Sequence, residues 1–310
     1  SKVVSQQVSL GDDLTMNFAV SVAPDNQDGT LTVSVAGEEV GSYAVSAMTP
    51  DENGHYCVSA ELAAAQMTDT VNLTLTDGET VFSKDYSVRS YALALLDEKG
   101  GFSDAVKTMA KAMLNYGAAA QVYFEHNTEK LANDGYITEN NVDLSTVEAP
   151  AVETSGKVEG LAFYGASLVF RGKVALRYYF DAPNGVDSFT FSAGDKTYEA
   201  KEKGDYYYIE IPGITPENYG KAVTVTAGTV DNTISVSYSP MTYLVRMYGK
   251  TGNESLKALV QNMYSYHTSA VEYIAQTEQD SEVELPYSPL FYSMCQYEEF
   301  IGNINPVSLG

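Results

Sequence analysis

The sequence predicts an α+β fold of two tandem repeats, each an antiparallel Ig-like β-sandwich followed by a helical hairpin. Three observations support this prediction. Similar segments recur about 150 residues apart. The first part of each repeat alternates apolar and polar residues, and the second part changes to the helical period of about 3.6 residues. With 310 residues and a 44% apolar fraction, the chain has the composition of a globular protein with a sizeable core.

The two repeats match most clearly in their helical parts. Residues 87–96 correspond to residues 239–248, and residues 111–124 correspond to residues 261–274. Identical residues in the longer segments include Met113 and Met263, Tyr116 and Tyr266, and Tyr123 and Tyr273. We interpret this match as an internal duplication.

The first part of each repeat is predicted to consist of strands. In the first repeat, apolar residues alternate with polar ones at Leu14, Met16 and Phe18, and again at Leu31 and Val33. In the second repeat we expect strands over residues 173–180, 188–191, 206–211, 223–226 and 234–238. Turn-forming Asn, Asp and Gly residues separate these runs, which is typical of an antiparallel sandwich with half-buried strands.

Helices are predicted where a capping residue precedes a run of helical period. Ser87 and Ser103 are the expected N-caps in the first repeat, and Ser239 and Asn253 are the expected N-caps in the second. Pro240 suits a first helical position because its missing N–H has no partner there in any helix.

These patterns give four segments. Residues 1–126 form the first repeat, residues 127–157 a polar connector draped on a surface, and residues 158–277 the second repeat. Residues 278–310 repeat nothing, and their apolar, aromatic composition predicts a tail that docks on the folded body.

The net charge of −23, from 41 acidic and 18 basic residues, limits the partners. Such a surface repels nucleic-acid phosphates and anionic lipid headgroups, so we expect no nucleic-acid partner. No stretch approaches the roughly 18 apolar residues of a spanning helix, so we expect no direct membrane insertion.

Cysteine and acidic residues suggest two further features. Cys57 and Cys295 are the 2 cysteines of the chain, and they either pair with each other or remain separate, because sequence does not give their distance. Asp25 and Asp28 cluster oxygen atoms before Gly29, so calcium is the one ion considered. The segment lacks the alternating ligands of a calcium loop, and a metal-free turn is the favoured interpretation.

Tyrosine is the unusual component: the chain has 24 Tyr and no Trp. Alternation sends Tyr206 and Tyr208 to one face of a strand and Tyr207 to the other. We single out Tyr178, Tyr206 and Tyr208 as candidate ligand-binding residues, because an exposed row could stack on sugar rings or contact a protein. The alternative, which we favour, is that these rings fill the core.

Catalytic signatures are weak. No phosphate-binding loop or nucleophile motif fits its required setting, and the three histidines have no metal-ligand spacing. We therefore expect a protein that is not an enzyme and that needs no cofactor. A glycosidase-like enzyme stays open as an alternative, because two carboxylates across a cleft leave no sequence motif.

The segment 111–121, Lys-Ala-Met-Leu-Asn-Tyr-Gly-Ala-Ala-Ala-Gln, preceded by residues 90–95, resembles repeat modules of large secreted or cell-surface proteins of Gram-positive gut anaerobes. The resemblance is looser in the second repeat. It implies an extracellular, accessory or adhesion role with a protein or glycan partner at the cell surface. A carbohydrate-binding module that uses exposed tyrosines is the alternative within binding.

Overall fold

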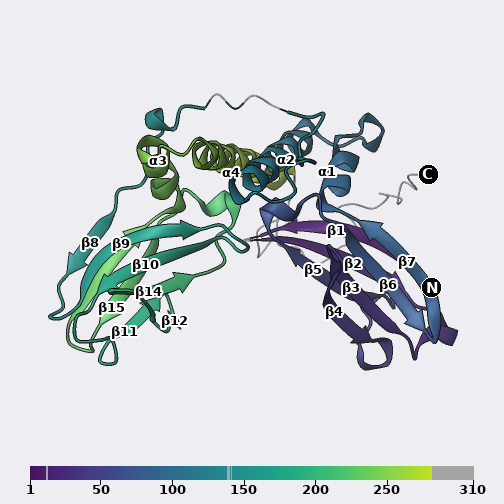
Figure 1. Ribbon diagram of the computed structural model, residues 1–310, viewed down its shortest axis with the longest axis horizontal. Helices are drawn as coiled ribbons and strands as arrows, with labels where there is room; N and C mark the ends of the chain where they lie inside the picture. Colours follow the sequence, from purple (N-terminus) through teal and green to yellow (C-terminus); the bar gives the residue numbers. More distant parts are fainter. Residues whose placement is uncertain (12, 138–139, 141, 281–310) are drawn as a thin grey trace. The chain divides into compact units, whose positions relative to one another are not determined.

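The computed structural model describes residues 1–11, 13–137, 140 and 142–280, and within them the chain has antiparallel β-sheets and four α-helices (Figure 1). The predicted α+β class is therefore confirmed. The chain divides into two compact units. The first runs from Ser1 to Thr138 and takes in helix α4 (Glu254–Asp280) from Ser269 onward; the second runs from Glu139 to Thr268.

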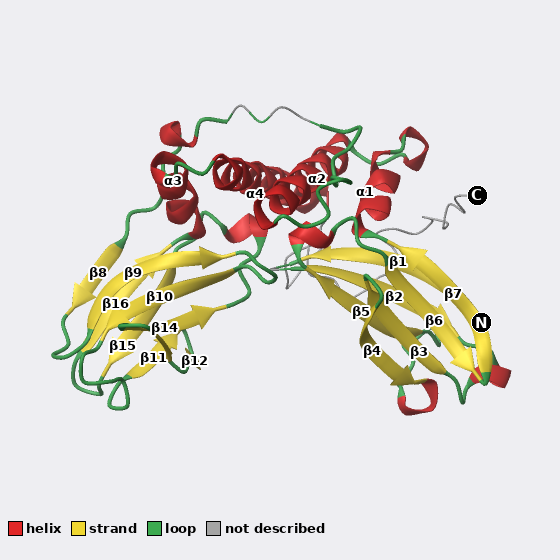
Figure 2. Ribbon diagram, in the orientation of Figure 1, coloured by secondary structure: helices red, strands yellow, loops and turns green. Residues whose placement is uncertain are grey.

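The first unit contains two antiparallel sheets, with strand orders β1-β2-β5 and β4-β3-β6-β7 (Figure 2). Their strands are β1 (Lys2–Leu10), β2 (Leu14–Ser21), β3 (Thr30–Val35), β4 (Glu38–Ala44), β5 (Tyr56–Leu62), β6 (Val71–Asp77) and β7 (Glu79–Tyr86). Alternate side chains are buried, as at Met16 and Phe18 in β2 and at Leu31 and Val33 in β3. The period-two pattern thus marks the faces that form the core.

Helices α1 (Val88–Leu96) and α2 (Asp104–Phe124) follow the sheets of the first unit. Both begin where the sequence predicts. The Ser87 side chain accepts a hydrogen bond from the backbone N–H of Ser90, and the Ser103 side chain accepts one from Val106. Each cap satisfies an N–H group that has no partner inside its helix.

Helix α2 is buried around almost its whole circumference. Between Met109 and Gln121 every side chain is buried except that of Lys111. Gly117 lies against the side chain of Met67, which follows the short 3₁₀ turn Ala64–Gln66, and a Cβ at position 117 would collide with the Met67 sulfur. The glycine therefore lets α2 approach this turn closely.

The second unit also has two antiparallel sheets, with strand orders β13-β14-β10-β9 and β12-β11-β15-β16-β8. Their strands are β8 (Glu153–Gly156), β9 (Ala162–Val169), β10 (Ala175–Asp181), β11 (Thr190–Ala193), β12 (Lys196–Thr197), β13 (Lys201–Lys203), β14 (Tyr206–Ile211), β15 (Val223–Gly228) and β16 (Thr233–Tyr238). The five strands predicted in this half are all present within a few residues of their expected bounds.

Helix α3 (Pro240–Lys250) and helix α4 continue the second unit. The Ser239 hydroxyl accepts a hydrogen bond from the Thr242 N–H, and the Asn253 side chain accepts one from the Leu256 N–H, as the predicted caps require.

The bounds of the units fall elsewhere than the sequence suggests. Strand β8 lies inside the predicted connector, yet it pairs with β16 and so belongs to the second sheet. Helix α4 reaches Asp280 rather than about residue 276, and its last part belongs to the first unit. At 1.5 Å per residue, this helix of 27 residues is about 40 Å long. The predicted docking of the tail concerns residues 281–310, which lie outside the described residues.

Buried tyrosines contribute to both cores. Burial raises the pKa of Tyr91, Tyr116 and Tyr178 well above the ordinary value, and it raises the pKa of Tyr273 to about 12. The Tyr178 hydroxyl donates a hydrogen bond of 2.6 Å to the carbonyl of Val223. These rings act as large apolar groups whose hydroxyls stay protonated.

We expect the protein to lose stability as the pH rises above about 10, the ordinary tyrosine pKa. Above that pH the unfolded chain releases protons that these four tyrosines still hold in the folded state, so their contribution is complete below about pH 10 and is lost at higher pH. Tyrosinate absorbance at about pH 11 should show fewer ionised tyrosines in the native protein than in the urea-unfolded protein. The Tyr178→Phe variant should reduce this difference by one tyrosine, and equal ionisation in both states would contradict the expectation.

Candidate functional site

Tyrosines and cations share the solvent-facing side of the sheet β13-β14-β10-β9. In β10, Leu176, Tyr178 and Phe180 are buried, so Arg177 and Tyr179 point to the opposite side. Directly opposed residues of antiparallel strands lie on the same face, which extends this side across the sheet. The opposed pairs on it are Arg177 with Glu210, Tyr179 with Tyr208, Tyr179 with Gly165, Arg177 with Ser167, Tyr208 with Lys201, and Tyr206 with Lys203.

A fourth tyrosine joins this side through a β-bulge. The register between β9 and β10 shifts between Tyr179 and Phe180, which leaves Tyr164 as the extra residue of β9. Tyr164 is 63% exposed, and its ring stacks on that of Tyr206 with centroids 4.0 Å apart and planes at 26°. We call Tyr164, Tyr179, Tyr206 and Tyr208 the tyrosine face.

Arg177 holds two of these rings in place. Its guanidinium lies over the Tyr208 ring, 4.7 Å from the centroid, and it donates to the Tyr179 hydroxyl and to the carboxylate of Glu210. Ser167 donates to the Tyr179 hydroxyl at 3.3 Å. Partial burial disfavours the charge of Arg177, but the hydrogen bond and the charge of Glu210 outweigh this effect and raise its pKa. The rings are therefore fixed before any ligand binds.

The stacked pair is coupled electrostatically to nearby carboxylates. A hydrogen bond with Tyr164 is the main cause that raises the pKa of Tyr206, and desolvation and the charges of Asp181 and Asp205 act in the same direction. Tyr206 therefore stays a neutral hydrogen-bonding group through the physiological pH range.

The structure corrects one of the three candidate ligand-binding tyrosines. Tyr178 is fully buried and points away from solvent, so its prediction as an exposed ligand-binding residue is wrong. In the sequence, the apolar residues Leu176 and Phe180, two positions before and after Tyr178, indicate that Tyr178 shares their buried face. Tyr206 and Tyr208 are partly exposed and lie on the same side, as the alternation predicts. Sequence reasoning missed Tyr164, Tyr179 and Arg177.

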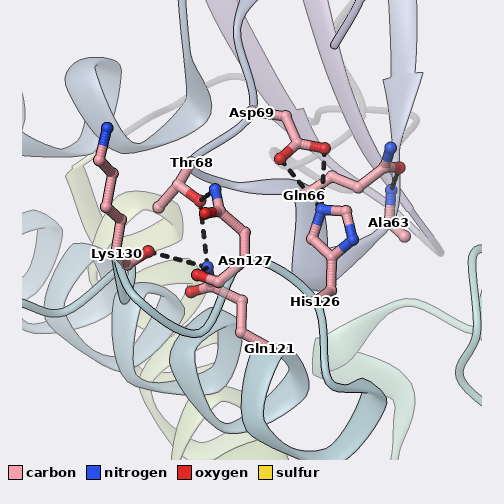
Figure 3. Close-up of polar contacts among 8 residues, drawn as sticks. All are labelled: Ala63, Gln66, Thr68, Asp69, Gln121, His126, Asn127 and Lys130. Carbon is pink, nitrogen blue, oxygen red and sulfur yellow. Dashed lines mark hydrogen bonds and ion pairs between the residues drawn. The ribbon is translucent and has the colours of Figure 1, made fainter.

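The first unit has a polar cluster around Gln121, whose side chain is fully buried (Figure 3). The amide oxygen accepts a 2.8 Å hydrogen bond from the backbone N–H of Ala132. The amide nitrogen donates to the Thr68 hydroxyl at 3.0 Å and to the carbonyls of Asn127 and Lys130 at 3.2 and 2.9 Å. Gln121 thus fastens residues 127–132 to helix α2.

A histidine and an aspartate lie beside this cluster. The His126 ring nitrogen Nε2 is 3.0 Å from both carboxylate oxygens of Asp69, as Figure 3 shows. The pair joins the end of α2 to the turn before β6. The Thr68 hydroxyl next to it accepts hydrogen bonds from Gln121 and Asn127. We interpret the cluster as structural.

The other two histidines also have packing roles. His55 follows a turn in which Asp51 accepts from the backbone N–H groups of Asn53 and His55. His267 donates through Nδ1 to the carbonyl of Pro216 at 2.6 Å and stacks on Tyr219. Desolvation lowers the pKa of His267, so the ring is neutral at pH 7.

The calcium and disulfide predictions stay untested. Asp25 and Asp28 are exposed, in and just after the 3₁₀ turn Pro24–Asn26. Within the described part of the chain, His, Cys, Asp and Glu side chains form no group of three or more that could hold a metal. Cys57 lies in β5 opposite Ala19, but Cys295 lies outside the described residues, so their pairing remains a prediction.

Helix hydrophobicity bears on the membrane prediction. Across the residues that the structure describes, the helices lack the combination of length and apolar character that a membrane span requires.

We expect the Gln121→Leu variant to lose about 2–4 kcal/mol of unfolding free energy, because the volume is nearly kept while buried backbone groups lose their partners. Urea unfolding followed by circular dichroism measures this loss. Thr108→Ala, at an exposed position of the same helix, should change stability by less than about 0.5 kcal/mol. Wild-type stability of Gln121→Leu would show that the cluster contributes nothing.

Comparison with known proteins gives no family assignment. No protein-family model matches the sequence, and no curated protein matches it.

Proposed function

We propose that this protein is a non-catalytic, extracellular accessory or adhesion module and that the tyrosine face is its ligand-binding surface. The observation that carries the proposal is the stacked pair Tyr164 and Tyr206 beside a second pair, Tyr179 and Tyr208, on one solvent-facing sheet. Clustered exposed aromatic rings are unusual on a protein surface and mark binding sites.

The fixed geometry of the rings supports a binding role. Arg177 contacts both Tyr179 and Tyr208, and Glu210 holds Arg177. Tyrosine and arginine are enriched in protein-binding surfaces, because both give large contact area and hydrogen bonds. Rings that are held before binding lose little side-chain entropy when a ligand arrives.

A carbohydrate ligand is the more specific form of this proposal. A sugar ring has one or two apolar faces and a rim of hydroxyls, so it needs an aromatic plane and polar groups beside it. Tyr164 offers an exposed plane, and Asp181 and Lys203 are on the same side of the sheet by strand alternation and pairing. A protein ligand is the alternative.

The contacts of two histidines support a non-catalytic role, because both side chains take part in packing interactions. His126 is bound to Asp69, and His267 donates to a backbone carbonyl. A glycosidase-like reaction would need two carboxylates at a sugar, whereas Glu210 on the tyrosine face is neutralised by Arg177.

The finer fold belongs to the same proposal: two tandem repeats, each an Ig-like β-sandwich followed by a helical hairpin. Equivalent backbone contacts support it. The Arg89 N–H donates to the Met67 carbonyl in the first unit, and the Met241 N–H donates to the Tyr219 carbonyl in the second. The contact of Met67 with Gly117 has its counterpart in the stacking of Tyr219 on His267.

We expect the double variant Tyr164→Ala, Tyr206→Ala to lose binding to surfaces that the wild-type protein recognises. The probes are a printed glycan array and plates coated with mucin, fibronectin or collagen, each with the purified full chain. Loss of two stacking rings should weaken binding at least about tenfold, since hot-spot aromatic residues contribute about 2 kcal/mol or more.

Tyr136→Ala is the matched control, because Tyr136 is 40% exposed and belongs to the first unit, whereas the tyrosine face belongs to the second. Binding that the double variant retains in full would refute the role of the face. Release of reducing sugar from the arrayed glycans would favour the glycosidase alternative.

A further inference from the structure

The tyrosine face carries an unusual local charge for this chain. The protein has a net charge of −23, yet Arg177, Lys201 and Lys203 all lie on this side of one sheet. Glu210 lies opposite Arg177 and forms an ion pair with it. The Arg177–Glu210 pair is therefore neutral, and the β13 edge of the face is cationic within an acidic protein.

The two lysines are available to a ligand. Among the residues that the structure describes, no carboxylate forms an ion pair with either ammonium group. Lys201 is exposed and lies opposite Tyr208. Lys203 lies opposite Tyr206, and its Nζ extends to 5.7 Å from the centroid of the Tyr179 ring, so its charge lies among the tyrosines.

Lysines on an edge strand commonly prevent pairing with other strands, and this role alone would explain exposed lysines on β13. It does not explain the direction of Lys203, which turns inward over the sheet to an aromatic ring. An ammonium group held beside an aromatic face is suited to a ligand that combines an apolar plane with a negative charge.

Two carboxylates flank the Tyr206 end of the face. Asp181 is at the end of β10 on the same side as Tyr179, Asp205 is in the turn between Lys203 and Tyr206, and the charges of both act on Tyr206. The negative group of a ligand is therefore favoured at the two lysines and disfavoured beside Asp181 and Asp205.

The surface between the rings is open. Gly165 lies opposite Tyr179 on the same side, and a Cβ built at Gly165 meets no atom within 4 Å. A glycine inside a strand is otherwise unfavourable and often marks the close approach of a ligand. A flat, open surface with an exposed ring at one end fits the faces of sugar rings better than the side chains of an acidic peptide.

Resting on the proposed binding function, we propose that the tyrosine face binds a carboxylated oligosaccharide. A sugar ring stacks on Tyr164, the chain of sugars crosses the open surface at Gly165, and the carboxylate lies between Lys201 and Lys203. Uronic acids and sialic acids both have this chemistry, a carboxylate attached to a sugar ring. Binding is non-covalent, and no bond of the ligand is broken.

Isothermal titration calorimetry with the full chain tests this proposal. The probes are trigalacturonic acid and its methyl ester, sialyllactose and lactose, and poly-L-glutamate. We expect each carboxylated sugar that binds to do so at least about tenfold tighter than its neutral counterpart at about 50 mM salt, and the difference should shrink at about 300 mM salt. Comparison of trigalacturonic acid with sialyllactose shows which of the two acidic sugars the protein binds.

Variants then separate charge from stacking. Lys201→Gln with Lys203→Gln should remove the preference for the acid over its neutral counterpart, while Lys203→Arg should keep it. Lys196→Gln, an exposed lysine on β12 of the other sheet, is the matched control and should bind as the wild type does. Circular dichroism of each variant confirms that it is folded.

Three outcomes would overturn the inference. In the first, the acid and its neutral counterpart bind with equal affinity, and Tyr164→Ala still abolishes binding. This would reject recognition of the carboxylate and leave the proposed binding function intact. Tighter binding of poly-L-glutamate than of any sugar would assign the face to acidic peptides. No binding of any sugar would also reject the inference, and the tyrosine-dependent binding to the coated protein surfaces would then decide whether the broader proposal survives.

Discussion

Burial of one face of the central strands is the constraint on which the structure of both units depends. Because side chains alternate along a strand, each residue placed in the core sends its neighbours to solvent. In β10 the core takes Leu176, Tyr178 and Phe180. This leaves Arg177 and Tyr179 on the outer face, where core packing does not constrain the type of residue. The tyrosine face is thus a consequence of how the core of the second unit is filled.

Arg177 turns this exposed face into an ordered one. Its guanidinium is planar, so it can lie flat over Tyr208 while its edge donates to Glu210 and to the Tyr179 hydroxyl. A lysine at this position could not make these contacts together. The same ion pair cancels the charge of Glu210, which leaves the lysines of β13 to determine the electrostatic character of the face.

The first unit uses buried polar groups for stability rather than for recognition. A buried amide is costly unless all its hydrogen bonds are made, and Gln121 makes them with the chain that follows α2. The pair of His126 and Asp69 extends the same contact region. In the second unit, by contrast, His267 stacks on Tyr219 and bonds to the carbonyl of Pro216.

The sequence by itself determined the features that depend on neighbours along the chain. Period-two alternation located the strands and their buried faces, and Ser87, Ser103 and Ser239 marked the starts of helices, because a cap bonds to N–H groups within its own first turn. Alternation also separated Tyr206 and Tyr208 from Tyr207.

Only the tertiary structure decided which tyrosines face solvent together. Tyr164 reaches the tyrosine face through a bulge, and a single extra residue reverses the side to which a side chain points. Whether β9 bulges depends on its pairing with β10, which sequence periodicity does not specify. The partners of Arg177 and the division of α4 between the units likewise depend on residues far apart in the chain, whose distances are set when the sheets and helices pack.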